Sequence, residues 1–269
     1  MDVYVSKGNQ IKDLKRRRLR LFLMVAIIGA LLVLGWYTIF VSQVFKVKLE
    51  FSGLSRLSEE QIKRSLVAAV FDSTLAGLLG QDNYLAWPSK IKLKEPLIAE
   101  LIVEKNLLEK KIVFHFKERE PFGIWCVSVF PALNIEHLTA SDANCSWFSK
   151  DGVLFAPAPI TEGSLILRVD SDGGEAAVLG NRVISDDFYR RVKEIFDFFS
   201  ESKKPVRRYA IDNQLQEFRA RLADGPDVRF SLRFDPTGSL EALTNLLEKP
   251  KYQRASYIDL TVENRVYAK

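Results

Sequence analysis

The stretch LFLMVAIIGALLVLGWYTIFVSQVF, residues 21–45, has no charged residue and decides how the rest of the chain is organised. Its 25 residues, as a helix rising about 1.5 Å per residue, exceed the roughly 30 Å hydrocarbon core of a bilayer. Trp36 and Tyr37 stand toward its far end, where aromatic belts lie. A cleaved signal peptide is the alternative, but it has a shorter apolar region followed by a small-x-small site. We therefore expect an uncleaved transmembrane helix.

The distribution of charge predicts the orientation of this helix. Residues 1–20 hold seven basic and two acidic residues, which accounts for the whole net charge of +5. The positive-inside rule then places residues 1–20 in the cytoplasm and residues 46–269 on the other side of the membrane, to whose acidic lipids the basic tail is attracted. Because the pI of about 9.1 comes from the tail, and a nucleic-acid-binding domain carries its basic patch on the folded body, no nucleic acid is expected as a partner.

The two cysteines, Cys126 and Cys145, both fall in the part expected outside the membrane. Disulfides form in such oxidising compartments. A bridge between them closes a loop of about 20 residues, which stabilises the fold by roughly 3 kcal/mol in the chain-entropy model. Two buried free thiols are the alternative. A metal site is not expected, because two cysteines and two distant histidines lack ligand spacing.

The first extracytoplasmic domain, expected over residues 46–120, has the pattern strand, helix, helix, strand, strand. Residues 46–53 alternate as a strand does. Ser58 and Gln61 form a capping-box pair ahead of an apolar helical stripe, and a weaker helical segment with two glycines follows. The stripe consists of Ile62, Leu66, Ala69 and Val70, and the two later strands are expected at residues 98–105 and 110–118. Two helices on one face of a three-stranded sheet make a small α+β core.

The second domain, expected over residues 121–269, is mostly β with two helices. Asp151 and Gly152 form a hairpin-turn pair between two apolar runs. One helix is expected to start near Ser185 and the other near Gly238 or Ser239. The strand-like runs are residues 122–130, 145–157, 163–174, 206–213, 217–223 and 227–234, followed by the last strand. The expected fold class is therefore α+β, with one transmembrane helix ahead of both domains.

The sequence shows no constellation typical of catalysis. GxSxG, HExxH, P-loop and GxGxxG motifs are absent. His115 alternates with Phe114 and Phe116, as a histidine on a sheet face does, and His137 has no evident partner. We expect no enzyme, no cofactor and no catalytic, cofactor-binding or metal-binding residue.

Three stretches, in order behind this topology, resemble the bacterial cell-division proteins of the FtsQ/DivIB family. FKEREPFGIWC (residues 116–126) is similar to the family's motif at the domain junction, CSWFSKDGVLFAPAP (145–159) to its D-x-x-G-x-x-F hairpin, and YIDLTVENRVYAK (257–269) to its terminal motif. The junction residues are Glu118, Arg119, Pro121 and Trp125. Proline suits a chain crossing between domains because it cannot donate to a ladder, Arg119 is expected to pair with Glu118 or Glu120, and Trp125 is expected in the core.

The resemblance implies that residues 46–120 form a POTRA domain and that the protein is a non-enzymatic divisome scaffold. Such a scaffold lies at the division septum, binds small bitopic coiled-coil proteins of the FtsB/FtsL or DivIC type, and supports septal peptidoglycan synthesis. Two alternatives remain: a membrane-anchored envelope enzyme such as a peptidoglycan hydrolase, and a POTRA-bearing export component.

The final strand is the expected site of partner capture. Ile258, Leu260 and Val262 share one face of an extended strand, and the residues between them share the other. In the family, a partner segment adds a strand to the last strand of the β domain. If the outer edge of this strand is unpaired, it is a template for β-augmentation. The expected partner-binding residues are Ser256, Tyr257, Asp259, Leu260, Thr261, Glu263 and Arg265.

Overall fold

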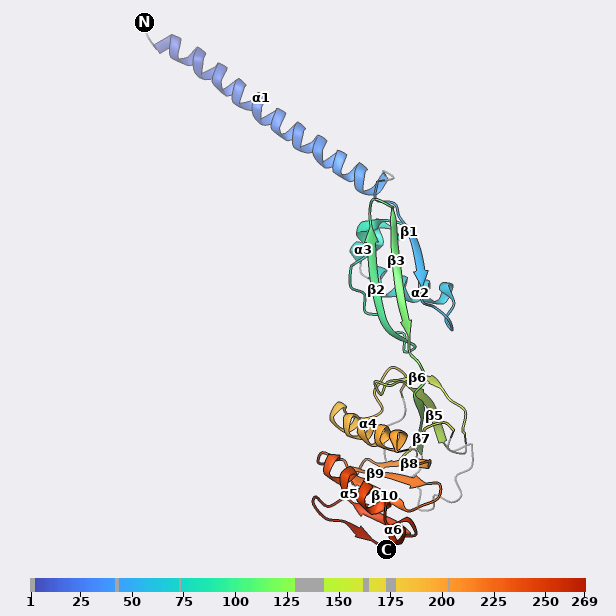
Figure 1. Cartoon of the computed structure of the whole chain (residues 1–269). Coiled ribbons are helices and arrows are strands. Elements are labelled where there is room, and N and C mark those ends of the chain that lie inside the picture. The colour runs from blue at the N-terminus through green and yellow to red at the C-terminus, as the bar shows by residue number, and fades with distance from the viewer. Residues whose placement is uncertain are drawn as a thin grey trace. The chain divides into compact units, whose positions relative to one another are not determined.

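The structure, a computed structural model of the whole chain, has a mixed α+β fold with one long N-terminal helix and a large β-sheet (Figure 1). The residues that it describes are 3–41, 44–72, 74–128, 143–161, 165–172, 178–202 and 204–269. The chain divides into two compact units. Unit 1 comprises Met1–Leu93 and Glu100–Lys117, and unit 2 comprises Lys94–Ala99 and Glu118–Lys269.

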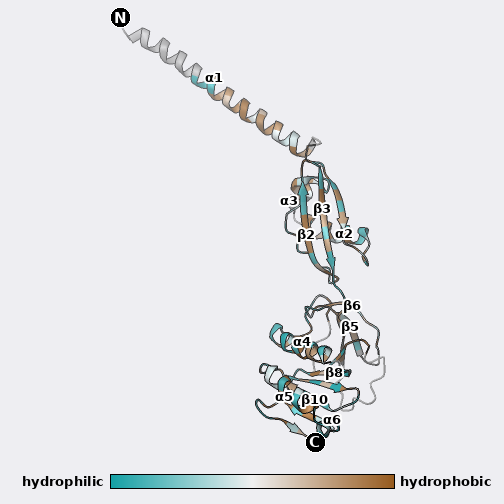
Figure 2. Cartoon of the chain, viewed as in Figure 1, coloured by the Kyte–Doolittle hydropathy of each residue, from teal (hydrophilic) through white to brown (hydrophobic). Residues whose placement is uncertain are grey.

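The N-terminal helix α1 (Val3–Trp36) continues into a short π-helical segment, η1 (Tyr37–Val41). The part Arg17–Phe40 is long and apolar enough to cross a membrane. Figure 2 shows this part mostly in the brown of apolar residues, and most of its leucine, isoleucine and valine side chains are exposed. The helix also extends well into the basic segment that precedes the apolar run.

Unit 1 contains a three-stranded sheet in the order β1-β3-β2, with β1 parallel to β3. Ser58 and Gln61 form a capping box at the start of α2, and Ile62, Leu66 and Val70 are buried on one face of that helix. The elements of unit 1 after α1 and η1 are β1 (Lys48–Ser52), α2 (Glu59–Phe71), α3 (Thr74–Leu79), the 3₁₀ turn η2 (Tyr84–Ala86), β2 (Ile98–Asn106) and β3 (Lys111–Glu118). Ala69, expected in the apolar stripe of α2, is exposed, while the larger Ile62, Leu66 and Val70 are buried.

Unit 2 contains a sheet of nine described strands in the order β12-β11-β10-β9-β8-β7-β4-β5-β6. Its strands are β4 (Gly123–Ser128), β5 (Ala143–Phe148), β6 (Leu154–Pro157), β7 (Arg168–Asp172), β8 (Val206–Asp212), β9 (Glu217–Leu222), β10 (Asp227–Ser231), β11 (Tyr257–Leu260) and β12 (Tyr267–Ala268). Its helices are α4 (Asp186–Glu201), α5 (Thr237–Leu247) and α6 (Pro250–Gln253). The expected hairpin at Asp151 and Gly152 joins β5 to β6, with Gly152 at a φ of +77°.

One hydrophobic core joins α4 and α5 to one face of this sheet. It includes Phe196 and Phe199 from α4, Leu243 from α5, and Phe218 and Phe230 from the strands. Because side chains alternate along a strand, the residues between these core positions point to the other face. The strand registers align one row of them across the sheet: Cys145, Cys126, Asp170, Ala210, Arg219, Arg229, Asp259 and Tyr267.

Candidate functional site

The C-terminal hairpin ends the large sheet at one edge. Strand β11 pairs in parallel with β10, and its other side pairs antiparallel with β12 through Ile258 with Ala268 and Asp259 with Tyr267. The turn between the two strands is closed by Arg265 N–H, which donates to the Val262 carbonyl over 3.1 Å. Asn264 adopts a φ of +59° in this turn, a conformation that asparagine tolerates better than most residues.

The sequence left open whether the last strand has an unpaired outer edge, and in the structure β12 occupies the outer side of β11 at Tyr257–Leu260. Both the backbone N–H and the hydroxyl of Ser256 donate to the Lys269 carbonyl, over 2.6 and 2.7 Å. Lys269 N–H in turn donates to the Tyr257 carbonyl over 3.3 Å. The strand also ends at Leu260 rather than running on through Val262, which is exposed. The turn that follows reverses the chain and brings the last residues back beside β11.

The structure separates the expected partner-binding residues into three environments. Leu260 is buried in the core of unit 2, so its side chain is not available to a partner. Tyr257 and Asp259 are half-buried on the face of the sheet opposite the core, where Asp259 accepts hydrogen bonds from the backbone and hydroxyl of Thr261, over 2.9 and 2.6 Å. Glu263 and Arg265 are exposed in the turn.

The sequence analysis missed the residues that form the actual edge, which are Tyr267 and Ala268 of β12, both exposed. Tyr257 and Lys269 exchange both of their backbone hydrogen bonds. In an antiparallel pair the next residues, Ile258 and Ala268, do not exchange such bonds. The N–H and C=O of Ala268 therefore point away from β11. The signal in the sequence was the polar pair Glu263 and Asn264, which separates two short strand-like runs.

A cavity of about 390 Å³ lies beside this hairpin. Leu260, Arg265 and Val266 line it from the hairpin, and Phe234 and Asp235 line it from the segment before α5. The hydroxyl and backbone N–H of Thr237 stabilise the Asp235 carboxylate and lower its pKa. The hairpin thus combines an exposed backbone edge with an adjacent hollow of mixed polar and apolar character.

Arg119, expected at the domain junction, anchors the start of unit 2. Its Nε donates to the Pro96 carbonyl over 3.0 Å, and its backbone N–H donates to the Leu97 carbonyl over 2.8 Å. Its guanidinium pairs with Asp151 over 2.5 Å. Partial burial alone would raise the pKa of Asp151, but hydrogen bonds from Ser149 and Arg119 and the positive charge of Arg119 lower it below its ordinary value.

The other junction residues have structural positions. Glu118 ends β3 and belongs with Arg119 to unit 2. Pro121 is exposed in the short segment between β3 and β4. Trp125 is buried in the core of unit 2, with its ring edge-on to Phe148 at a centroid distance of 5.8 Å. Packing of Trp125 against Phe148 can hold β4 in place.

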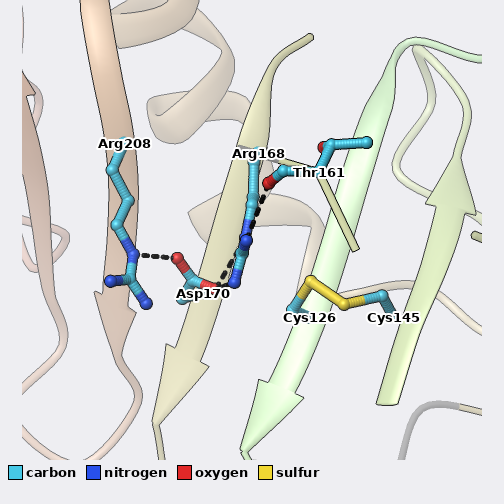
Figure 3. The surroundings of a disulfide bond; sticks show 6 residues. All are labelled: Cys126, Cys145, Thr161, Arg168, Asp170 and Arg208. Atoms are coloured by element: carbon cyan, nitrogen blue, oxygen red, sulfur yellow. Dashed lines mark hydrogen bonds and ion pairs between the residues drawn. A yellow bond between two sulfur atoms is a disulfide. The ribbon is translucent and has the colours of Figure 1, made fainter. Parts of the chain in front are cut away.

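Cys126 and Cys145 form a disulfide with an S–S distance of 2.06 Å (Figure 3). They lie directly opposite each other on β4 and β5 and are buried with Ile124. Beside them on the same face, the buried Asp170 carboxylate accepts from Arg168 over 2.9 Å and also pairs with Arg208. Arg168 further donates to the Thr161 carbonyl over 2.8 Å. Buried charges are tolerated when paired in this way, so the two arginines satisfy the Asp170 carboxylate.

The described residues offer few side chains suited to catalysis. His115 lies with Nδ1 2.8 Å from the Ser52 hydroxyl and Nε2 3.3 Å from the Glu104 carboxylate, all on the exposed face of the unit 1 sheet. None of the described residues forms a cluster of three or more metal-ligating side chains. His137 lies outside the described residues.

Comparison with known proteins gives no identification. No protein-family model matches the chain. A search of curated proteins finds no significant match either.

Proposed function

We propose that the chain is a non-enzymatic, single-pass membrane scaffold of the bacterial divisome, of the FtsQ/DivIB type. On this proposal residues 1–20 lie in the cytoplasm and both folded parts lie outside the inner membrane, at the division septum. The scaffold binds small bitopic coiled-coil division proteins of the FtsB/FtsL or DivIC type. Through them it supports septal peptidoglycan synthesis. It requires no cofactor.

Three features support this proposal. One helix is long and apolar enough to cross a membrane, with basic residues before it. The elements that follow in unit 1 have the order β1, α2, α3, β2, β3, which is the order of a POTRA domain. The stretches that resemble the family lie at the start of unit 2, at the β5–β6 hairpin and in the C-terminal hairpin.

The observation that carries the proposal is the exposed edge of β12. In the described part of the chain β12 pairs with β11 alone. Its outward N–H and C=O at Ala268 are the groups that an added strand needs. Main-chain hydrogen bonds then provide affinity, and exposed side chains such as Tyr267 and Arg265 provide register. The site of partner capture is therefore β12 and the turn before it, instead of the β11 edge expected from the sequence.

Replacement of one outward donor tests this proposal directly. Ala268→Pro removes the N–H that faces away from β11, and proline is tolerated at such edge positions. Ala268→Val keeps the N–H and is the matched control. We expect the proline variant to recover roughly tenfold less partner, the effect of losing a hydrogen bond of about 1.4 kcal/mol.

The measurement is co-purification of the tagged full chain from membranes, with the bound small proteins identified by mass spectrometry. The thermal unfolding of unit 2 is measured in parallel, and it should be the same for both variants. Equal recovery of coiled-coil division proteins by Ala268→Pro, Ala268→Val and the wild type would overturn strand addition at β12. Recovery of no such protein by the wild type would overturn the scaffold itself.

A further inference from the structure

Four leucines are exposed at one end of unit 1, where soluble loops are normally polar. Leu107 and Leu108 form the turn between β2 and β3, and Leu108 is 97% exposed. Leu78 in α3 is 70% exposed, and Leu85 in η2 is also exposed. Large apolar side chains gathered on a surface in this way mark a site of contact with a membrane or another molecule.

Hydrogen bonds place Leu85 and the turn of Leu107 and Leu108 at the end of unit 1 from which the chain enters the apolar helix. Beside the turn that holds Leu107 and Leu108, Lys48 N–H donates to the Lys110 carbonyl over 2.9 Å. Beside Leu85, Tyr84 N–H donates to the Phe45 carbonyl over 2.7 Å.

A third bond ties the same end to the helix itself. Asn83 is buried, and its side-chain amide donates to the Ile39 carbonyl over 2.9 Å. Ile39 is inside the apolar stretch Arg17–Phe40. From Phe40 to Lys46 the chain extends by about 20 Å at most, since a fully extended residue spans about 3.5 Å. Wherever the helix crosses the bilayer, this end of unit 1 lies close to the membrane surface.

The charges around the leucines suit lipid headgroups. Lys48 and Lys111 are paired in the register of β1 and β3. Lys110 lies beside Lys48, whose backbone N–H donates to its carbonyl, and Lys46 forms a bridge with Asn83. Two carboxylates pair with these lysines: Glu109, 2.5 Å from the Lys111 ammonium, and Asp82, 4.0 Å from the Lys46 ammonium. Glu50 and Glu104 also interact with Lys111, so the lysines offer contacts to anionic headgroups rather than a net positive charge.

We propose that this end of unit 1 is a bilayer-docking surface. Leu107 and Leu108 insert into the interfacial layer of the outer leaflet, Leu78 and Leu85 rest against it, and the lysines lie at headgroup level. The lipid is that of the membrane which the helix crosses. The proposal rests on the membrane anchoring proposed above, and it is independent of partner capture at β12. Docking would hold unit 1 against the bilayer.

Site-directed spin labelling of the full chain in nanodiscs tests the proposal. Both native cysteines are in the disulfide, so a single introduced cysteine takes the label. The nanodiscs contain one part phosphatidylglycerol and three parts phosphatidylethanolamine. Labels are placed by Leu108→Cys at the docking surface, by Leu215→Cys in unit 2 as the control, and by Leu31→Cys within the apolar helix. Leu215 is a matched control because it is an exposed turn leucine, 47% accessible, between two strands.

We expect the label at position 108 to favour collisions with oxygen over collisions with a water-soluble nickel complex, as a lipid-exposed label does. The label at position 215 should show the opposite preference. A further variant carries the label at Leu85→Cys together with Leu107→Ser and Leu108→Ser, so that the label reports docking after both turn leucines are removed. Each leucine removed lowers the docking equilibrium constant roughly tenfold, so this label should become accessible to nickel.

The three positions separate the possible failures. A nickel-accessible label at position 108 with a lipid-exposed label at position 31 would overturn the docking surface and leave the anchor intact. A nickel-accessible label at position 31 would overturn the anchor, and the docking surface with it. A label at position 108 that is immobilised but exposed to neither probe would show that protein, a second copy included, covers the leucines, and this would also overturn lipid docking.

Discussion

At the scale of single residues, Arg119 shows how much of a site depends on contacts distant in sequence. From the sequence we expected Arg119 to lie at the domain junction and to pair with a neighbouring glutamate. In the structure the Arg119 guanidinium pairs with Asp151, in the β5–β6 hairpin, and its Nε donates to the Pro96 carbonyl. The pairing with a neighbouring glutamate stays a prediction. No local sequence pattern shows such a pair, because Arg119 and Asp151 are 32 positions apart and only the folding of the chain brings them together.

The same pair makes the stability of unit 2 depend on pH. The pKa of Asp151 is lowered in the folded chain from 3.8, so its contribution is fully present above about pH 4 and is lost as pH falls through the folded pKa. Asp151→Asn should lower the free energy of unfolding at pH 7 by about 1 kcal/mol, because the carboxylate is half exposed. Below pH 4 the variant and the wild type should converge.

Chemical denaturation of the full chain in micelles, followed by tryptophan fluorescence from pH 7 to pH 2, measures this effect. Glu241→Gln is the control, because it removes an exposed charge from α5. An unfolding difference between Asp151→Asn and wild type that does not shrink toward pH 2 would contradict the assignment.

At the scale of elements, the end of β1 depends on one glycine. Gly53 follows β1 with a φ of +82°, and a Cβ there would stand 2.0 Å from the Phe116 carbonyl oxygen of β3. Gly53→Ala should therefore separate β1 from β3 and destabilise unit 1 by more than about 3 kcal/mol, since both the backbone strain and the clash must be relieved.

Hydrogen exchange of the full chain, resolved by peptide, measures this effect. Faster exchange should appear in β1 and β3 and leave β8 to β10 unchanged. Gly238→Ala is the control: nothing lies within 4 Å of the added Cβ, and alanine in a helix gains up to about 1 kcal/mol over glycine. Unchanged exchange in β1 with Gly53→Ala would show that the turn accommodates a side chain.

Elements with a strong period were predictable, and short ones were not. The alternation of Ile112, Phe114 and Phe116 predicts β3, and all three are buried as expected. The two-residue strand β12 has too few residues to show any period, and only its pairing with β11 defines it. For this reason the C-terminal segment could be recognised as a candidate site from its sequence, but the short strand that forms the edge could not.

At the scale of the whole molecule, topology decides what the sequence cannot show. The predicted boundary at residue 120 is close to the start of the long part of unit 2 at Glu118, yet Lys94–Ala99 also belongs to unit 2. The first two residues of β2 therefore belong to unit 2, while the rest of the strand belongs to unit 1. Hydrogen bonds from Arg119 to Pro96 and Leu97 explain this grouping. Composition along the chain carries no signal of it.

The disulfide depends on the cellular compartment and on the pairing of β4 with β5, and it contributes to the stability of unit 2. Cys126 and Cys145 are opposite each other on adjacent strands, 4.0 Å apart at Cα, with a sequence separation of 19. Removing a bridge over a loop of that length lowers the free energy of unfolding by about 3 kcal/mol in the chain-entropy model. The variant combines Cys126→Ala and Cys145→Ala, because alanine leaves no unsatisfied hydroxyl in the apolar cluster around Ile124.

Denaturation of the full chain with and without reductant should show that loss in unit 2 and none in unit 1, which contains neither cysteine. Reductant should shift the wild type toward the variant and leave the variant unchanged. Mass spectrometry of unreduced protein from membranes adds a test of location. An intact bridge requires the oxidising side of the membrane, so free thiols on both cysteines would contradict the bridge and the orientation proposed for the helix together.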